Sequence, residues 1–364
     1  MISGRSAAAA ARGSTGALYY TLEELRHHWQ RIDILAPHAH GLPAETRLFD
    51  NVWIHISPKR ILRHPWWLAR YGAQLHTQYH YRSVVVQEYP PFYNGLGAYL
   101  LWRCTQLPYI LQFHHIPGYP RAADWREDVQ RKAIQWFASA DARHATAVQV
   151  VNQRQTPDFL AKAGVPRNKL IYIPSLYIDL QTYTPVVTKR VFDCILVGRL
   201  VLNKGLGLFL EALAQTQATA CIVGEGPQRT AVEQRIQALG LQHRVQLHGW
   251  ARDAAEISTL MRQAGMLVVA SYNEGGPRVA VEAMACGVPV VTTHVGIMED
   301  LGRNGETVVF ADWQPAALAQ AIERVRHDTT LHARLASAGL AIAARFERRA
   351  TIANFANEIK RLTS

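Results

Sequence analysis

Two glutamates on either side of a glycine-rich turn have the clearest chemical potential in this 364-residue chain. Glu274 and Glu282 lie eight positions apart in the phrase N-E-G-G-P-R-V-A-V-E. The apolar run 266–270 before them predicts a short buried strand, and 279–285 predicts a helix with Pro277 near its first turn. Backbone N–H groups point outward at such a helix start, and the helix dipole favours negative charge there. The stretch therefore predicts an anion site flanked by two carboxylates.

Two basic residues form a second group with chemical potential. In the segment F-D-C-I-L-V-G-R-L-V-L-N-K-G at 192–205, an apolar strand is followed by Gly198, which allows a tight turn. Arg199 and Lys204 then follow, five positions apart. Arginine offers a two-pronged fork of donors and lysine a compact charge, a combination that suits a diphosphate. The pair could clamp a diphosphate on a loop between a strand and the next helix, although basic residues at such positions more often belong to an ordinary solvated loop.

Short apolar strands alternate with helical stretches along the chain, and these elements must position both groups. Such alternation predicts parallel sheets covered by helices on both faces. The strand candidates are 32–35, 83–87, 109–113, 147–151, 170–173, 194–197, 220–223, 245–247, 266–270, 288–292 and 307–310, with helical patterns at 205–214, 228–239 and 313–325. Two sets of strands, separated near 183–189, predict an α/β fold with two doubly wound parallel-sheet domains. Because ligands of open α/β sheets bind at the carboxyl ends of the strands, we expect the site in the cleft between the domains.

Four segments resemble the family-4 retaining glycosyltransferases, which move a sugar from a nucleotide donor. The phrase E-G-G-P-R-V-A-V-E-A-M-A-C-G resembles their Glu-x7-Glu motif, and G-R-L…K-G at 198–205 resembles their phosphate-binding segment. C-I-V-G-E-G-P at 221–227 and V-Q-L-H-G-W at 245–250 resemble two further segments near the nucleotide. The resemblance implies the GT-B architecture, in which two Rossmann-like domains face a cleft.

The resemblance also implies a role for each matched residue. Arg199 and Lys204 would bind the donor phosphates, Glu274 would contact the transferred sugar, and Glu282 would bind the ribose hydroxyls. Further positions implied to line the nucleotide and its distal phosphate are Gly198, Gly224, Gly226, Trp250, Gly275, Gly276 and Pro277.

The GT-B architecture implies an acceptor-side domain at 1–184, a donor-binding domain at 185–345 and a helix at 346–364 that crosses back to the first domain. The start departs from the family, whose members begin with an apolar strand, a glycine-rich loop and a helix. Here G-S-T-G-A-L-Y-Y at 13–20 is expected to supply the loop and the helix start, and the alanine-rich stretch 1–12 is only weakly strand-like. Either this strand is degenerate or the true start lies upstream.

A histidine at a strand end extends the resemblance into the first domain. L-P-Y-I-L-Q-F-H at 107–114 matches a strand of the family, and by resemblance His114 would touch the donor sugar and join the catalytic residues. His115 follows where a small or acidic residue is commoner. Further on, Ser175 and Leu176 stand where relatives have asparagine and glycine.

The composition is sufficient for two buried cores and shows no pattern typical of disulfide, metal-binding or membrane-spanning proteins. The chain is 49% hydrophobic and 18% charged, and its four cysteines are scattered without a C-x-x-C pair, which favours a reducing compartment. No metal-ligand spacing and no Asp-x-Asp motif occurs, so we expect no metal and no cofactor beyond the nucleotide sugar. No uncharged apolar run of about 18 residues predicts a membrane span.

Positive charge is concentrated in the first half, together with tryptophan. The formal net charge is +11, and residues 1–180 hold 20 Lys and Arg against 12 Asp and Glu. The densest patch is 57–70, S-P-K-R-I-L-R-H-P-W-W-L-A-R, in which basic residues neighbour Trp66 and Trp67. Such a segment suits an anionic membrane surface, although the tryptophans could equally pack into the core and leave the arginines solvated.

Together these features predict a metal-independent glycosyltransferase. It would move a hexose-type sugar from a nucleoside-diphosphate donor to a lipid-linked or cell-envelope glycan acceptor, with retention at the anomeric carbon. We expect it in the cytoplasm, as a peripheral protein on the inner membrane face. The alternatives are a nucleotide-sugar epimerase or phosphorylase-like enzyme of the same fold, and a basic nucleic-acid-binding protein. The last has charge in its favour, but no nucleic-acid-binding motif is present, so no nucleic acid is expected.

Overall fold

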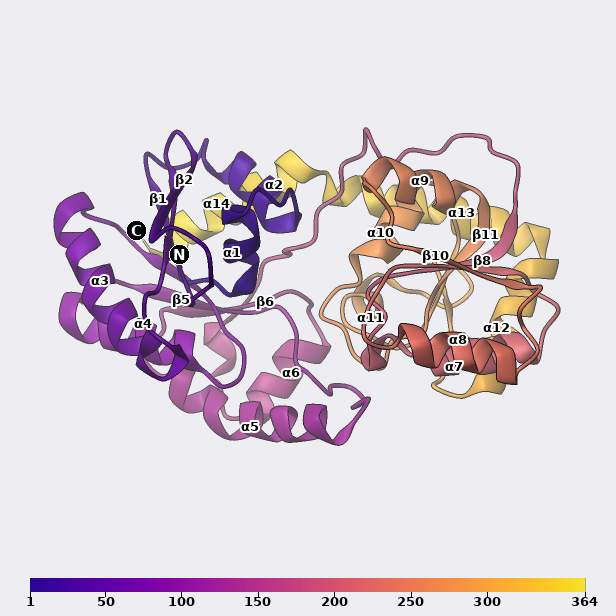
Figure 1. Cartoon of the computed structure of the whole chain (residues 1–364), viewed down its shortest axis with the longest axis horizontal. Helices are drawn as coiled ribbons and strands as arrows, with labels where there is room; N and C mark the ends of the chain where they lie inside the picture. Colours follow the sequence, from indigo (N-terminus) through magenta and orange to yellow (C-terminus); the bar gives the residue numbers. More distant parts are fainter. Residues whose placement is uncertain (364) are drawn as a thin grey trace.

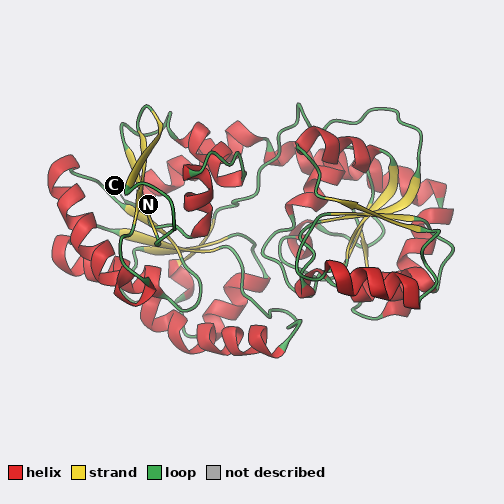
Figure 2. Cartoon of the chain, viewed as in Figure 1, coloured by secondary structure: helices red, strands yellow, loops and turns green. Residues whose placement is uncertain are grey.

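The computed structural model describes residues 1–363, apart from the side chain of Arg5. It shows two α/β domains side by side, each with a central sheet between layers of helices (Figures 1 and 2). No helix in this described range is long and apolar enough to span a membrane.

The second domain is built on one continuous parallel sheet. Its strand order is β10-β9-β8-β11-β12-β13, with all pairs parallel. Numbered from β8, this is the 3-2-1-4-5-6 order of a Rossmann fold, whose ligand crevice lies where the order reverses, here between β8 and β11. The strands are β8 (Phe192–Val197), β9 (Ala220–Val223), β10 (Val245–Gly249), β11 (Ala264–Val269), β12 (Val290–Thr292) and β13 (Val309–Phe310). The helices are α7 (Leu206–Ala214), α8 (Arg229–Ala238), α9 (Ala254–Arg262), α10 (Arg278–Ala285), α11 (Met298–Leu301), α12 (Pro315–His327) and α13 (Thr329–Ala343).

The first domain has a sheet in two parts. One part has the order β1-β3-β2 and the other the order β4-β5-β6-β7. All pairs are parallel except β2 with β3. The strands are β1 (Ile32–Ala36), β2 (Glu45–Phe49), β3 (Val52–Ile56), β4 (Val84–Gln87), β5 (Tyr109–Phe113), β6 (Ala147–Val150) and β7 (Leu170–Tyr172). The helices are α1 (Arg5–Ala11), α2 (Ala17–Leu25), α3 (His64–Tyr79), α4 (Tyr93–Thr105), α5 (Trp125–Ala142) and α6 (Gln155–Lys162).

The start of the chain corrects one prediction. Ile2 forms parallel bridges to Leu35 and Val86, so it joins the two parts of the sheet as a degenerate first strand. The loop after this strand is Ser3-Gly4, and α1 begins directly behind it. The stretch 13–20, expected to be that loop and the start of the helix behind it, instead comprises the connection from α1 to α2 at 13–16 and the first residues of α2. Alanines pack α1 closely against the sheet, because they are helix formers that need little room.

The hairpin of β2 and β3 was absent from the predicted strands. β2 is a half-exposed edge strand with charged residues, which hides its period. His55 interrupts the apolar pattern of β3, yet it is buried because its Nε2 lies 2.7 Å from Asp33 Oδ1 and its Nδ1 lies 3.0 Å from the Tyr71 hydroxyl. A buried polar residue of this kind is tolerated when its hydrogen bonds are satisfied.

The chain crosses between the domains twice, and the crossings lie together. The first is the segment 173–191, and the second leads from α13 into α14 (Arg348–Leu362), the yellow helix that returns to the first domain in Figure 1. Ile178 N donates to Phe346 O at 2.7 Å, and Arg348 N donates to Ile178 O at 3.0 Å. Ile352 and Ala356 of α14 are buried in the first domain's core.

Candidate active site

The crevice of the second sheet brings together one member of each predicted group, Lys204 and Glu274. The loop after β8 contains the 3-10 turn η3 (Leu202–Lys204), and the loop after β11 carries Glu274. The two loops approach closely, since a Cβ on Gly205 would lie 2.0 Å from the carbonyl oxygen of Ala270. Gly205 also has φ +64, which glycine adopts at no cost. Glycine at this position thus lets the two loops meet.

Lys204 and Glu274 form an ion pair at this crevice. Ser271 Oγ donates to Glu274 Oε1 at 3.0 Å, so the carboxylate is held from two sides. The Lys204 side chain is 22% exposed and that of Glu274 16% exposed, so the pair is partly shielded from water while a ligand can still reach it. A cation and a carboxylate in one partly dry crevice can bind a phosphate and a sugar hydroxyl in adjacent positions.

Arg199 lies on the same loop as Lys204, directly after Gly198. It is exposed, and among the described residues no carboxylate lies within ion-pair distance of it. Gly198 precedes it, and a Cβ there would approach Lys204 Cε to 3.3 Å. Glycine therefore leaves room for the lysine stem, and the loop after β8 carries an exposed arginine as well as the paired Lys204.

The remaining predicted glycines pack loop against loop. A Cβ on Gly224 would lie 1.9 Å from Gly198 O, and one on Gly226 would lie 2.4 Å from Leu200 O. These glycines bring the loops after β8 and β9 into direct backbone contact. Trp250, directly after β10, is 65% exposed, so its ring is open to a ligand.

The turn before α10 touches the first domain. A Cβ on Gly275 would lie 1.6 Å from the carbonyl oxygen of His114, whereas one on Gly276 would have its nearest neighbour at 3.4 Å. Pro277 is the N-cap of α10 and supplies no side-chain hydrogen bond, so the first N–H groups of the helix lack a side-chain acceptor. The helix start remains available to an anion, and the first domain closes over it.

Glu282 lies apart from the Lys204–Glu274 pair. It is 8% exposed, and the Tyr183 side chain hydrogen-bonds to it from the segment that links the domains. Burial raises the pKa of Glu282 to about 7, while the positive charge of Arg278 and the bond from Tyr183 act in the opposite direction. The two glutamates of the motif therefore occupy different surroundings, one partly exposed and paired with Lys204, the other buried and hydrogen-bonded to Tyr183.

His114 sits at the end of β5, where its backbone meets Gly275. Its Nδ1 lies 3.2 Å from Ser175 Oγ, and its Nε2 has no hydrogen-bond partner. Burial lowers the pKa of His114 to about 4, so the ring is neutral near pH 7. The unpaired Nε2 is a buried polar atom of the kind that a ligand can satisfy.

Asn273, next to Glu274, is the centre of a hydrogen-bonded clamp between the domains. It is fully buried, and its Oδ1 lies 2.8 Å from His115 Nε2. Its Nδ2 donates to Glu127 Oε2 at 2.7 Å and to Arg121 O at 2.8 Å. Three residues of the first domain therefore fix the backbone that carries Glu274.

Further polar contacts cross the cleft beside this clamp. Asn152 Nδ2 donates to Gly275 O at 3.1 Å, and Gln155 Oε1 accepts from Gly296 N at 2.7 Å. Gln153 N donates to Asp300 Oδ2 at 2.6 Å. The structure is thus closed over the crevice by hydrogen bonds.

Sequence reasoning named His115 and Asn273 without giving them this role, and it missed Ser271, Glu127 and Arg121. Ser271 has a local signal, because it lies three residues before Glu274. The clamp has none, since its partners are separated by 146 to 158 positions. The described residues include no group of three or more His, Cys, Asp or Glu side chains placed to hold a metal ion.

Comparison with known proteins identifies the class. The chain superposes on sucrose-phosphate synthase from Thermosynechococcus elongatus with a TM-score of 0.80 at 20% identity, covering 94% of this chain and 91% of the other. Anabaena HepE in complex with UDP and glucose gives a TM-score of 0.73 at 22% identity, covering 96% and 97%. These similarities establish the GT-B fold of two facing Rossmann-like domains.

The second domain carries the family match. Residues 187–341 match the family described as glycosyl transferases group 1. Alpha-D-kanosaminyltransferase of Streptomyces kanamyceticus is 27% identical over 270 residues, which cover 67% of this chain and 69% of that protein. The putative colanic acid biosynthesis glycosyltransferase WcaL of Salmonella typhimurium is 30% identical over 188 residues, 47% of this chain and 46% of that protein. The matches support a group 1 glycosyltransferase, related to sugar transferases of envelope polysaccharide biosynthesis, and do not favour the other functions considered.

Proposed function

We propose that the protein transfers a hexose-type sugar from a nucleoside-diphosphate donor to a lipid-linked or cell-envelope glycan acceptor, without a metal ion and with retention at the anomeric carbon. The observation that carries this proposal is the Lys204–Glu274 pair at the reversal point of the Rossmann sheet, next to the start of α10 and on the loop that also carries the exposed Arg199. A phosphate-binding crevice is expected at this point of the fold.

In this proposal the leaving nucleoside diphosphate gains negative charge as its bond to the sugar breaks. Arg199, Lys204 and the N–H groups at the start of α10 stabilise that charge. Fixed donors of this kind act before the reaction begins and need no rearrangement during it. Because these charges replace a divalent ion, activity is expected to persist in a chelator.

Glu274 and His114 lie on the sugar side of the phosphates in this proposal. Glu274 accepts from sugar hydroxyls, and its negative charge also limits how tightly a free diphosphate binds to Lys204. His114 contributes its unpaired Nε2. Behind them, Glu282 binds the ribose hydroxyls, and the exposed ring of Trp250 contacts the base.

The ligands of similar proteins support a nucleotide-sugar donor and a glycan acceptor. The HepE structures contain UDP, UDP-glucose or UDP with glucose, and a Staphylococcus aureus TarM structure contains alpha-GlcNAc-glycerol and UDP. An acceptor held on a lipid also fits the basic, tryptophan-rich first domain, with the enzyme on the cytoplasmic face of the inner membrane. All four cysteines are free thiols, which fits a reducing compartment.

The test is thermal stabilisation by a panel of nucleoside diphosphates and nucleotide sugars in the presence of EDTA. We expect one base to raise the melting temperature, and Arg199→Ala and Lys204→Ala to abolish the rise. Lys189→Ala, which removes an exposed cation from the linking segment, should retain it. A folded wild-type protein that responds to no nucleotide would refute the donor site, and a response that requires a metal would refute metal independence.

A further inference from the structure

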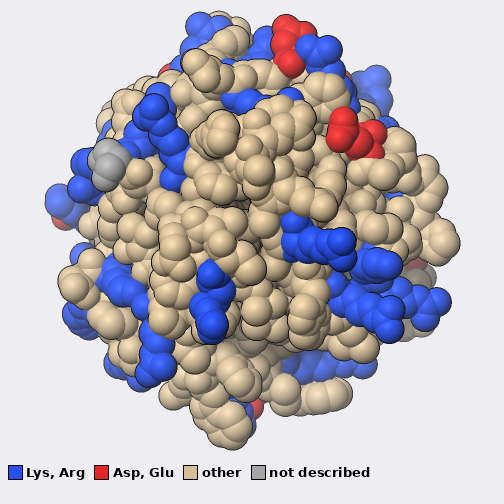
Figure 3. All heavy atoms as spheres, turned by 90° about the vertical axis from the view of Figure 1, so that its left-hand side faces the viewer, with Lys and Arg blue, Asp and Glu red and all other residues tan. Residues whose placement is uncertain are grey.

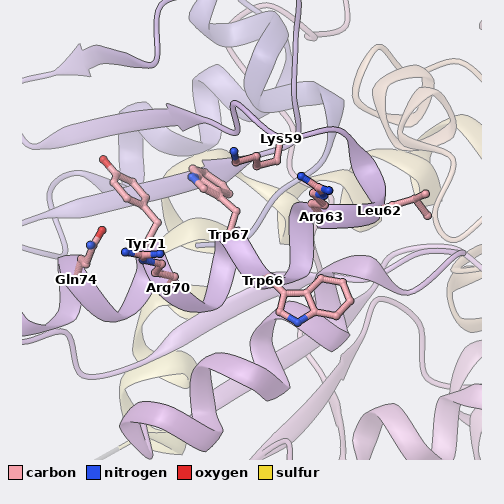
Figure 4. Close-up of a pocket in the computed structure, with 8 residues that line it drawn as sticks. All are labelled: Lys59, Leu62, Arg63, Trp66, Trp67, Arg70, Tyr71 and Gln74. Carbon is pink, nitrogen blue, oxygen red and sulfur yellow. The ribbon is translucent and has the colours of Figure 1, made fainter.

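A cavity of about 770 Å³ lies along α3, outside the candidate active site (Figure 4). The aromatic part of the lining comes from Trp66, Trp67 and Tyr71. The charged part of the lining comes from Lys59, Arg63 and Arg70. No acidic side chain contributes to it. The cavity therefore combines flat apolar surfaces with three positive charges.

Two of the three aromatic rings, Trp67 and Tyr71, are held in place by neighbouring side chains. The rings of His64 and Trp67 stack with centroids 5.6 Å apart, and those of Trp67 and Tyr71 stack at 5.3 Å. Tyr71 is held in turn by His55, at 3.0 Å between its hydroxyl and Nδ1. This column runs along one face of α3, because positions 64, 67 and 71 are three and four residues apart. A ligand would meet a surface that is already ordered.

The three cations lack carboxylate partners. In the described part of the chain, no ion pair involves Lys59, Arg63 or Arg70, although exposed arginines elsewhere do pair, as Arg235 does with Glu211. Figure 3 views the molecule from the side where α3 lies in Figure 1, and lysine and arginine are spread across it with few acidic residues. The charge of this cavity is therefore complementary to that of an anionic ligand.

An exposed apolar edge adjoins the cavity at the 3-10 turn η1 (Ile61–Arg63) and the first turn of α3. Ile61 is 51% exposed, Leu62 70% and Trp66 62%. Large apolar side chains beside a basic cluster are the composition that lies at a membrane interface, with the chains in the headgroup boundary and the cations on lipid phosphates. A soluble anion would leave this edge in water.

We propose that the α3 cavity binds the phosphate headgroup of an anionic membrane lipid. Lys59, Arg63 and Arg70 contact the phosphate, while Leu62 and Trp66 enter the interfacial layer. The inference deepens the proposed function, on which it rests for the membrane-borne acceptor, and gives the first domain a defined lipid contact. The charge complementarity and the adjoining apolar edge favour a lipid over a free phosphate or an acidic peptide.

The experiment is sedimentation of the full chain with vesicles of phosphatidylglycerol and of phosphatidylcholine. The cavity variant is Lys59→Gln/Arg63→Gln/Arg70→Gln, in which all three positions are exposed. The matched control is Lys162→Gln/Arg82→Gln/Arg143→Gln, which removes the same three charges from exposed positions of the same domain that do not line the cavity. We expect wild type to bind the anionic vesicles only, the cavity variant to lose at least about tenfold in partitioning, and the control to stay within about twofold.

Equal losses of vesicle binding in the cavity variant and the control would show that binding depends on overall charge and not on this cavity, which would overturn the proposal. Absence of wild-type binding to the anionic vesicles would overturn it as well. Glycerol phosphate at millimolar concentration should not displace the protein from the vesicles, and displacement would indicate a free-phosphate site instead. Trp66→Ala should weaken binding while leaving the fold intact, because that ring is largely exposed. The nucleotide-dependent thermal shift of the cavity variant should match wild type, so failure of the lipid site and failure of the donor site can be told apart.

Discussion

The two domains position the residues that face the cleft in different ways. In the second domain, β8 and β11 are neighbours in one unbroken parallel sheet, and their loops meet through glycine backbones around Lys204 and Glu274. In the first domain, only the short segment at Ile2 joins the two parts of the sheet. It contributes to the cleft both side chains and backbone groups of residues far from the second domain in the sequence, of which His115, Glu127 and the Arg121 carbonyl are examples. A site made by backbone contact has a local sequence pattern, whereas a site made by distant side chains has none.

Substitution of Lys204 tests the donor side and should have the largest effect. Lys204→Ala removes a fixed positive charge where the leaving diphosphate develops charge, so turnover should fall by about 10²–10³, equivalent to roughly 3–4 kcal/mol. Steady-state kinetics with the donor found in the thermal panel would measure it. Lys189→Ala is the matched control, and near-wild-type turnover in Lys204→Ala would contradict the site.

Substitution of Gly275 tests whether the first domain must close on the donor turn. A Cβ would lie 1.6 Å from His114 O, so Gly275→Ala should hold the domains apart. Displacement by about an ångström can cost about 10²-fold in rate. Gly276→Ala, with its nearest neighbour at 3.4 Å, should lose much less. Equal rates in the two variants would show that closure at this point is unimportant.

Asn273→Ala tests the clamp from the side of the second domain. It removes hydrogen bonds to His115, Glu127 and the Arg121 carbonyl, so Glu274 should be held less firmly. We expect kcat to fall about tenfold, near 1.4 kcal/mol, with nucleotide affinity changed little. Isothermal titration with the nucleoside diphosphate would separate the two quantities. His115→Gln keeps a hydrogen-bond donor to Asn273, so its kcat should lie between those of wild type and Asn273→Ala. If Asn273→Ala lost nucleotide affinity by the same factor as kcat, Asn273 would be assigned to nucleotide binding instead.

Glu282→Gln tests the buried carboxyl that lies apart from the Lys204–Glu274 pair. Its expected effect, a change in how the melting temperature depends on pH, is the smallest of the four. Burial raises its pKa to about 7, so near pH 5 the folded chain keeps a proton that the unfolded chain has largely released. Stability from this group is therefore lost as pH rises towards and through 7. The melting temperature of wild type relative to Glu282→Gln should fall between pH 5 and 8, as measured by circular dichroism. Glu306→Gln, at an exposed position, should show no such trend.

Sequence patterns predicted the elements of the second domain well because strand ends, glycines and charged residues lie close together there. The stretch from Gly198 to Lys204 and the stretch from Glu274 to Pro277 each contain a strand end, glycines and charges within a few positions. The strands of the second domain were therefore predicted with small errors at their ends. The GT-B fold followed from the same alternation and is confirmed by the similar structures.

Five strands of the first domain, β1 and β4 to β7, were also predicted, but its other features were missed for physical reasons. The strand at Ile2 is too short to show a period, and β3 contains His55, whose burial depends on Asp33. The clamp depends on contacts across the cleft that no local pattern encodes. The patch at 57–70 was visible as charge and tryptophan, but only the structure shows that Trp67 is fixed in a stack while Trp66 remains exposed.

The paired crossings between the domains have a mechanical consequence. Ile178 exchanges backbone hydrogen bonds with the residues around Glu347, so both covalent connections pass through one narrow seam. Two connections that lie side by side can act as a hinge. Rotation of one domain relative to the other about this hinge is then the easiest movement. Opening would then swing His115 and Glu127 away from Asn273 together, so the donor could enter and the spent nucleotide could leave without either sheet being deformed.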